Sequence, residues 1–344
     1  MTAVEPSSAV NTLSHRRGVT IAMTDEIYHE LLSMANAPLE SAAVLLGHLV
    51  GTSEQSPRVV VTAVRSVPDD AYRVRGEREL EITSEGYMHA LAEASTSNAL
   101  AIWVHTHPGD GASVLPSRHD DVVNVELHDV FALRSTPGRY AWMVLGCTSG
   151  RLTFTGALVE TNPADEVRFT RLNVVGSGFR RISAQDDAGA EVLPELFDRN
   201  IRALGFDVQT VISDLTVAVV GVGGTGSAVA EQLVRLGVRR LIVIDPDTLS
   251  LSNITRVYGS TPHDVGQPKV DVIARHLTRI APDLLIRPVQ GTITTERVAR
   301  ELLGADLVFG CTDDNAGRLR LSRFPYYYDI PVIDCGVLLN SDAD

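Results

Sequence analysis

The sequence predicts an α/β protein of two domains, a mixed sheet with flanking helices followed by a Rossmann-like, doubly wound parallel sheet. Its 344 residues exceed the usual size of one domain, about 100–200 residues. Up to residue 160, strand-like apolar runs are interspersed with a few helical patterns. From about residue 192, strand and helix patterns alternate regularly, which is typical of a doubly wound parallel sheet.

The first domain is predicted over residues 19–160, after a mobile tail at residues 1–18. Residues 161–190 are rich in Gly, Ser, Asp and Ala and show little periodicity, so they are predicted to be a linker. The expected strands lie at 18–23, 42–50, 58–67, 99–107, 140–147 and 151–160, and the expected helices at 24–37, 84–95 and 117–131.

The second domain is predicted over residues 191–344. Its expected strands lie at 216–224, 239–247, 284–291, 306–313 and 330–336, and its expected helices at 193–205, 227–237, 269–282 and 294–304.

Composition and charge narrow the functional classes. The chain is 44% hydrophobic and 21% charged, without an apolar run near the ~18 residues of a membrane span, and its amino terminus lacks the apolar core of a secretory signal. We therefore expect a cytoplasmic protein. The net charge of −13 disfavours nucleic acid as a partner. Cys147, Cys311 and Cys335 form no C-x-x-C pair, so we expect buried thiols rather than a thiolate zinc site.

A metal site is predicted where an apolar strand ends in His105 and His107. These histidines are two residues apart, so both imidazoles project from one face of the strand. Asp120 lies thirteen residues after His107, on the first turn of a helix that begins at Ser117. Two imidazoles and a carboxylate leave one tetrahedral position for water, which is typical of catalytic zinc. H-x-H alone is weak evidence, and Ser117 with Asp120 also fits a capping box.

The run H-T-H-P followed by Ser-x-x-Asp resembles the JAMM signature of JAB/MPN-type metalloproteases. The upstream segment LESAAVLLG resembles the second signature of that family through Glu40, Ala43 and Gly47, with Ala43 where the family usually carries Gly.

The resemblance implies that His105, His107 and Asp120 hold Zn²⁺. It implies that Glu40 transfers a proton from bound water to the leaving amine and that Ser117 donates a hydrogen bond to the oxyanion. The implied target is a peptide or isopeptide bond after the C-terminal glycine of a ubiquitin-like protein.

A nucleotide site is predicted at the loop GVGGTG, in which Gly221, Gly223 and Gly226 match G-x-G-x-x-G between a strand and a helix. The glycines allow backbone amides and the helix N-terminus to approach phosphate. Asp245 lies nineteen residues after Gly226, at the end of the next strand, where it is suitably placed for a ribose hydroxyl. These residues alone predict an NAD-binding Rossmann domain.

The rest of the segment resembles the ThiF/MoeB/HesA family. The resemblance rests on the glycine loop, on DPDTLSLSNITR (245–256), on GQPK ending at Lys269, and on Cys311-Thr312-Asp313. It covers about residues 192–340, and family members continue beyond the last strand, so this domain is expected to be incomplete.

By this resemblance Gly221, Gly223, Gly224 and Gly226 hold ATP together with Asp245 and Asp247, and Asp245 binds the ribose. Asn253, Arg256 and Lys269 contact the phosphates, Arg256 acts in catalysis, and Asp313 helps to place Mg²⁺. Arg199 matches an arginine that family dimers insert into the ATP site of the neighbouring subunit, which implies a homodimer and a catalytic role for Arg199.

The leading hypothesis is a bifunctional enzyme that processes a ubiquitin-like or sulfur-carrier protein ending in glycine and activates its carboxylate. The implied cofactors are Zn²⁺, ATP and Mg²⁺, and a conjugating enzyme is a further candidate partner. Two alternatives stay open. The second domain could serve only for binding or dimerisation, or the chain could be an NAD-binding Rossmann protein.

Overall fold

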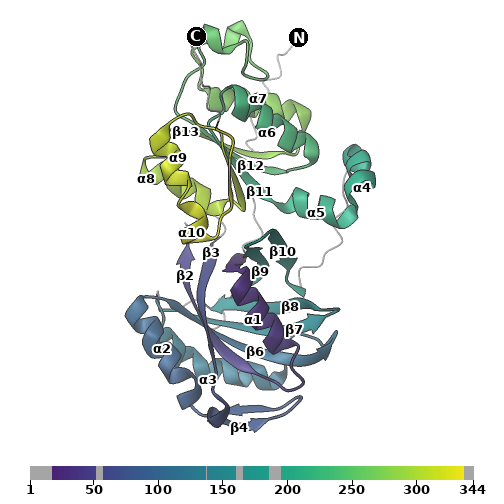
Figure 1. Ribbon diagram of the computed structural model, residues 1–344, viewed down its shortest axis with the longest axis vertical. Helices are drawn as coiled ribbons and strands as arrows, with labels where there is room; N and C mark the ends of the chain where they lie inside the picture. The colour runs from purple at the N-terminus through teal and green to yellow at the C-terminus, as the bar shows by residue number, and fades with distance from the viewer. Residues whose placement is uncertain (1–17, 52–56, 137, 160–165, 186–194, 337–344) are drawn as a thin grey trace, which may run out of the picture.

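The computed structural model describes residues 18–51, 57–136, 138–159, 166–185 and 195–336 and divides into two domains stacked along its long axis (Figure 1). The predicted α/β class, a mixed sheet followed by a parallel sheet, is confirmed. Apart from Gly18, the tail predicted at residues 1–18 lies outside the described residues.

The first domain is built on an eight-stranded mixed sheet with the order β1-β3-β2-β6-β7-β8-β9-β10. Because β1 also pairs with β9, the sheet curls back on itself. Its strands are β1 (Val19–Thr24), β2 (Ala42–Val50), β3 (Arg58–Ser66), β6 (Leu100–Asp110), β7 (Tyr140–Thr148), β8 (Arg151–Val159), β9 (Glu166–Val175) and β10 (Phe179–Ser183).

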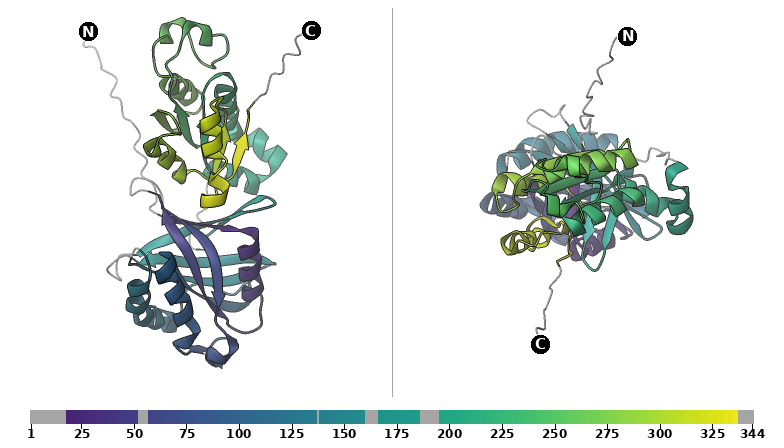
Figure 2. Two further views of the ribbon diagram at one scale, coloured as in Figure 1. Left: turned by 60° about the vertical axis from the view of Figure 1, so that its left-hand side comes forward. Right: turned by 90° about the horizontal axis from the view of Figure 1, so that it is seen from above.

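Three helices cover this sheet (Figure 2). α1 (Asp25–Ala35) buries Tyr28 and Leu31 against one face. α2 (Glu85–Ser97) and α3 (Arg118–Arg134) bury Leu91 and Phe131 against the other. The sheet therefore separates two cores.

The linker predicted at 161–190 is wrong over residues 166–183, which form β9 and β10. The glycine-rich part of this stretch is the turn between the two strands, and Phe169, Leu172 and Val174 of β9 point into the core. The pairing of β9 with β1 shifts register after Phe169, so Phe169 and Leu172 are three residues apart and the alternation is interrupted. Residues 160–165 and 186–194 lie outside the described part of the chain.

The first domain also contains a hairpin that was not predicted. It comprises β4 (Tyr72–Arg75) and β5 (Leu80–Ile82) after a short 3-10 turn, η1 (Asp69–Ala71). Figure 1 shows β4 at the end of the molecule remote from the second domain.

The second domain has a five-stranded sheet with the order β13-β12-β11-β14-β15, all parallel. The order reverses at β11, and ligands of such sheets bind at that point, beyond the carboxyl ends of the strands. The strands are β11 (Thr216–Val220), β12 (Arg240–Asp245), β13 (Leu285–Gln290), β14 (Leu307–Gly310) and β15 (Val332–Asp334).

Helices cover both faces of the parallel sheet, as a doubly wound fold requires. α6 (Gly224–Leu236) and α7 (Lys269–Ile280) pack on one face. α8 (Glu296–Ala299), the 3-10 helix η6 (Arg300–Gly304), α9 (Asn315–Leu321) and α10 (Phe324–Tyr328) pack on the other. The helix predicted at 294–304 is thus split into α8 and η6, and α9 and α10 were not predicted.

Two helices precede this sheet, α4 (Asp198–Leu204) within the predicted segment and α5 (Phe206–Asp214), which was not predicted. No helix of the described residues combines the length and the apolar character that a membrane crossing requires.

The prediction of three buried thiols holds for Cys147 alone. Cys311 and Cys335 are half-buried, because they lie just beyond the carboxyl ends of β14 and β15. Burial, and next the Cys335 thiol, raise the pKa of Cys311 to about 12, which disfavours a nucleophilic thiolate there.

Candidate functional site

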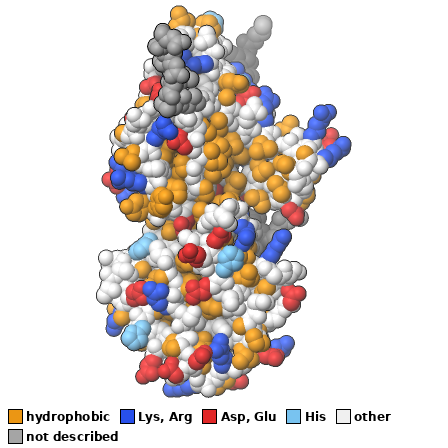
Figure 3. All heavy atoms as spheres, in the orientation of Figure 1, with side chains coloured by type: hydrophobic (Ala, Val, Ile, Leu, Met, Phe, Trp, Pro, Cys, Tyr) orange, Lys and Arg blue, Asp and Glu red, His pale blue; other side chains and the backbone are white. Residues whose placement is uncertain are grey.

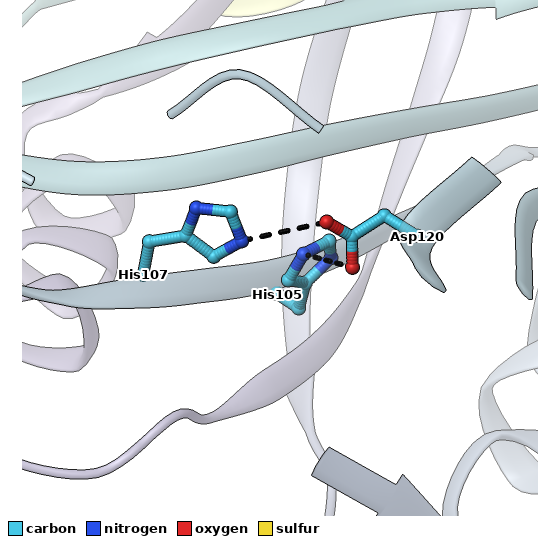
Figure 4. Close-up of side chains that lie close together, drawn as sticks. All are labelled: His105, His107 and Asp120. Carbon is cyan, nitrogen blue, oxygen red and sulfur yellow. Dashed lines mark ion pairs between the residues drawn. The ribbon is translucent and has the colours of Figure 1, made fainter. Parts of the chain in front are cut away.

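Three side chains converge at the carboxyl end of β6 (Figure 4). Asp120 Oδ1 lies 3.2 Å from His105 Nε2, and Asp120 Oδ2 lies 3.5 Å from His107 Nε2. One ligand atom from each residue lies within 4.8 Å of the other two. Two imidazole nitrogens and one carboxylate oxygen are a suitable donor set for zinc.

Sheet pairing also brings Glu40 to this place. Ala42 of β2 is the register partner of His105 of β6 in an antiparallel pair. Two residues further along that register, Glu40 falls opposite His107, on the same face as His105. The backbone of Glu40 is held on both sides, since its N–H donates to Gly76 O at 2.8 Å and its carbonyl accepts from Arg75 Nε at 3.0 Å.

Glu40 is only 8% exposed and lines the same cavity as the two histidines. Burial raises its pKa, although the charges of His105 and His107 oppose the shift. A carboxyl group with a raised pKa beside a candidate metal is a suitable general base. The structure thus brings Glu40 to the metal-site residues, as the hypothesis of a hydrolase requires.

Asp120 and Ser117 do form a capping box at the start of α3. Ser117 N–H donates to Asp120 Oδ2 at 2.6 Å, and Asp120 N–H donates to Ser117 Oγ at 3.2 Å. Burial would raise the pKa of Asp120, but His105 and His107, followed by the Ser117 N–H, lower it well below its usual range. The capping box and the metal cluster therefore coexist, and the cap fixes the orientation of the carboxylate.

Two further observations fit a bound metal ion. His107 Nδ1 lies 2.7 Å from Ser113 O, so the ring donates there and leaves Nε2 free as a ligand atom. Hydrogen bonding to Asp120, and next to the Ser113 carbonyl, raises the pKa of His107. His105 Nε2 is buried and, despite the nearby Asp120 oxygen, lacks a partner in hydrogen-bonding geometry among the described residues. A cation placed between these atoms would satisfy all three side chains.

A cavity of about 930 Å³ opens onto this cluster. Besides Glu40, the histidines, Ser117 and Asp120, its walls include the hairpin residues Glu77 to Ile82. The sequence interpretation missed this wall. The alternation of Tyr72 and Val74 before Gly76, and of Leu80 and Ile82 after it, is the signal that could have revealed it.

The glycine loop between β11 and α6 is the second candidate site. Gly221 has φ +87°, and a Cβ there would approach Cys311 O to 2.8 Å. A Cβ on Gly226 would lie 1.7 Å from Gly221 O, so this close packing of loop on helix requires glycine. A Cβ on Gly223, the N-cap of α6, would meet nothing within 4 Å. The helix N-terminus therefore opens onto space that a phosphate could fill.

Asp245 and Asp247 lie at the carboxyl end of β12, beside this loop. Asp245 Oδ2 accepts from Val222 N–H at 2.8 Å, and Asp245 Oδ1 accepts from Asp247 N–H at 2.9 Å. Lys269 Nζ lies 2.7 Å from Asp247 Oδ2 and 3.7 Å from Asp245 Oδ1. Burial raises the pKa of Asp245. A nearly buried lysine is thus held at the loop by two carboxylates.

Asn253 and Arg256 follow in the segment after β12. Asn253 is buried, and its Oδ1 accepts from Ser250 N–H at 3.1 Å. The Arg256 guanidinium donates to Ser252 O at 3.1 Å, and its Cδ lies 3.2 Å from the Cβ position of Gly224. Gly224 therefore makes room for Arg256 above the start of α6.

Asp313 and Arg199 are placed differently. Asp313 is exposed in the loop after β14, two residues beyond the Cys311 carbonyl that Gly221 approaches. Arg199 is exposed on α4, which packs on α5. The predicted nucleotide residues from 221 to 313 thus gather at one edge of the sheet, whereas Arg199 belongs to a separate helical pair.

The fold comprises a mixed-sheet domain with a candidate metal centre, followed in the sequence by an α/β domain with a glycine loop. Family comparisons agree with this division. Residues 197–341 match the ThiF family, and residues 23–155 match the prokaryotic homologs of the JAB domain. These two matches support a JAB domain joined to a ThiF-type adenylyltransferase domain.

Relatives with assigned names match the second domain. The molybdopterin-synthase adenylyltransferase of Escherichia coli (strain K12) is 37% identical over 133 residues, which cover 39% of this chain and 53% of that protein. The tRNA threonylcarbamoyladenosine dehydratase 2 of Saccharomyces cerevisiae is 38% identical over 137 residues, covering 39% of this chain and 31% of that protein. The chain thus spans about half the length of the first relative and less than a third of the second.

Among solved structures, TcdA (CsdL) is 25% identical with a TM-score of 0.41, and the match covers 44% of this chain and 65% of that chain.

Proposed function

We propose that this chain processes and activates a ubiquitin-like or sulfur-carrier protein that ends in glycine. The JAB domain hydrolyses the peptide or isopeptide bond after that glycine, and the ThiF-type domain adenylates the resulting carboxylate with ATP. The observation that carries the proposal is the convergence of His105, His107 and Asp120 beside the buried Glu40. One domain would produce the carboxylate that the other consumes.

In the first reaction His105, His107 and Asp120 would hold Zn²⁺. A zinc ion so bound supplies an acidified water and polarises the scissile carbonyl. Glu40, with its raised pKa, takes the proton of the attacking water and delivers it to the leaving amine. Ser117 Oγ accepts the Asp120 N–H, so its own hydrogen is free to be donated to the oxyanion.

In the second reaction the glycine carboxylate attacks the α-phosphorus of ATP, and the bond to pyrophosphate breaks. Gly223 and the N-terminus of α6 receive phosphate oxygens, while Arg256 and Lys269 offset their charge. Asp245 binds the ribose, and Asp313 is the residue that would hold Mg²⁺. The names of two relatives, molybdopterin-synthase adenylyltransferase and sulfur carrier protein ThiS adenylyltransferase, support this assignment.

The peptidase assignment is tested with Glu40→Gln. We expect the variant to retain zinc, measured by elemental analysis, and to cleave a glycine-extended carrier protein at least about a hundredfold more slowly, because proton transfer is lost. Glu79→Gln, on the cavity wall, is the matched control and should leave the chemical step unchanged. Equal cleavage by wild-type protein and Glu40→Gln would refute the assignment.

Pyrophosphate exchange separates the adenylation proposal from its alternatives. Exchange into ATP that depends on a carrier protein is expected. A domain that only binds or dimerises would show none, and an NAD-binding protein would bind NAD and ignore ATP. Because some relatives are named as tRNA dehydratases, tRNA is the control substrate. The net charge of −13 favours the protein substrate.

A homodimer and a cytoplasmic location complete the proposal. Figure 3 shows hydrophobic side chains gathered over the ThiF-type domain on the face in view. The large apolar side chains exposed by this domain include Phe206, Tyr326 and Tyr327, and an exposed apolar patch is typical of a protein interface. Light scattering should give twice the mass of one chain, and Arg199→Ala should slow adenylation without removing ATP binding.

A further inference from the structure

A buried network of charged side chains joins the two domains. Asp306, just before β14, accepts from Arg58 Nη2 at 3.2 Å, from Arg181 Nη1 at 2.7 Å and from Asn173 Nδ2 at 2.9 Å, all in the JAB domain. Within its own domain it accepts from Thr216 N–H at 3.0 Å. Burial would raise the pKa of Asp306, but Arg181 and Arg58 lower it to about 2. The carboxylate is therefore ionised and shared between the domains.

A second carboxylate, Asp214 at the end of α5, extends the network. It pairs with Arg171 of β9, with Arg181 Nη2 at 3.1 Å and with Arg240 Nη1 at 3.1 Å. Opening the domains would break these ion pairs and also the hydrogen bond from Asn173 to Asp306. The network therefore opposes a hinge motion that would bring the two candidate sites together.

The network lies far from the metal centre. Val50, at the end of β2, pairs with Arg58, whereas Ala42, at its start, pairs with His105. Eight residue steps along β2 separate these points, about 26 Å at the usual rise of a strand. The metal centre is thus at the opposite end of the strand that reaches the other domain.

The network is also separated from the glycine loop. Thr216 and Asp306 stand at the amino ends of β11 and β14, whereas Gly221 follows the carboxyl end of β11. The five residue steps from Thr216 to Gly221 correspond to about 16 Å along β11. Figures 1 and 2 show the domains stacked end to end, with the β4 hairpin at one end and α6 and α7 on the other domain.

We infer that a carrier protein is released after hydrolysis and rebinds, in solution or at another copy of the chain, before it is adenylated. This inference rests on the proposed function. If the carrier protein stayed bound, its C-terminal tail would have to reach from one site to the other. The tail would span about 40 Å, which takes at least about 11 fully extended residues. The buried network opposes a domain motion that would shorten that path.

The experiment is an isotope dilution with two variants, each lacking one reaction. The substrate is labelled sulfur carrier ThiS extended beyond its C-terminal glycine, and unlabelled mature ThiS is the competitor. Two samples are compared. One contains the wild-type chain, and the other contains an equimolar mixture of the Glu40→Gln and Arg256→Ala chains. Each sample receives a tenfold excess of competitor over substrate. Intact-mass spectrometry then measures the labelled adenylate.

Release between the sites predicts that the competitor lowers the labelled adenylate about tenfold in both samples. Direct transfer along one chain predicts that the wild type keeps its label while the mixture loses it, and that result would overturn the inference. Hydrolysis by Arg256→Ala and pyrophosphate exchange by Glu40→Gln are measured separately. If the wild-type chain lacks either reaction, the proposed function fails, and the inference fails with it.

Discussion

The two candidate sites differ in construction, because one is formed by side chains and the other by the backbone. At the candidate metal centre, side chains from three segments converge, and hydrogen bonds hold Glu40, His107 and Asp120 in place. At the nucleotide site, the backbone makes the cavity, and the glycines matter for the atoms they lack. Removing atoms should therefore disable the first site, whereas adding atoms should disable the second.

The largest effect is expected from His105→Ala, which removes a ligand from the side-chain site. Zinc content should fall to background, and hydrolysis should slow at least about a thousandfold, because metal polarisation contributes several kcal/mol. Pyrophosphate exchange should remain, since the glycine loop is in the other domain. His119→Ala, an exposed neighbour on the cavity wall, is the control and should retain zinc. Full zinc content in His105→Ala would contradict the assigned ligand set.

The next largest effect should come from Asp306→Ala, which tests whether the two domains are separable. Arg58 and Arg181 would be left buried without their shared carboxylate, which should cost about 3–5 kcal/mol of unfolding free energy. Urea denaturation followed by tryptophan fluorescence would measure this loss. Glu93→Ala, which removes the exposed pair with Arg65, should barely change the midpoint. Similar midpoints for the two variants would show that the network does not join the domains.

The convergence of the three candidate metal ligands could be predicted from the sequence because its signals are local. Two-residue spacing on a strand placed His105 and His107 on one face, and a helix cap placed Asp120. Glu40 had no such local signal and came only from resemblance to a family. Its position depends on the pairing of β2 with β6, which spacing along the chain does not reveal.

The network between the domains could not be predicted, because burial of a charge depends on a distant partner. Arg58 and Asp306 are 248 residues apart in the sequence. An arginine at the start of a strand is ordinarily solvated, and only the folded arrangement shows that Arg58 is 3% exposed. For the same reason Arg181 was assigned to a linker.

Two glycine substitutions sharpen the comparison at the backbone-built site. Gly226→Ala should destabilise the fold by about 1–3 kcal/mol, because its Cβ would lie 1.7 Å from Gly221 O. Gly223→Ala should leave the unfolding free energy within about 0.5 kcal/mol of wild type, because its Cβ meets nothing within 4 Å. It should nevertheless weaken ATP binding about tenfold or more, measured by calorimetry, because the methyl group takes the place of phosphate. Normal ATP affinity in Gly223→Ala would place the phosphates elsewhere.

The smallest effect should come from Asp329→Asn, where the domains influence each other through charge. Burial raises the pKa of Asp329 to about 6, although Arg58 of the other domain opposes the shift. A raised pKa in the folded state means that Asp329 favours folding below its unfolded pKa of about 4, and this contribution disappears as pH rises through 6. Asparagine also tolerates the left-handed φ of 48° at this position. Asp329→Asn should therefore raise the unfolding free energy by about 1–2 kcal/mol at pH 7.5 and change it little at pH 4. Urea titrations at the two pH values measure the difference, and an equal gain at both would mean that the substitution acts through packing rather than through the charge of Asp329.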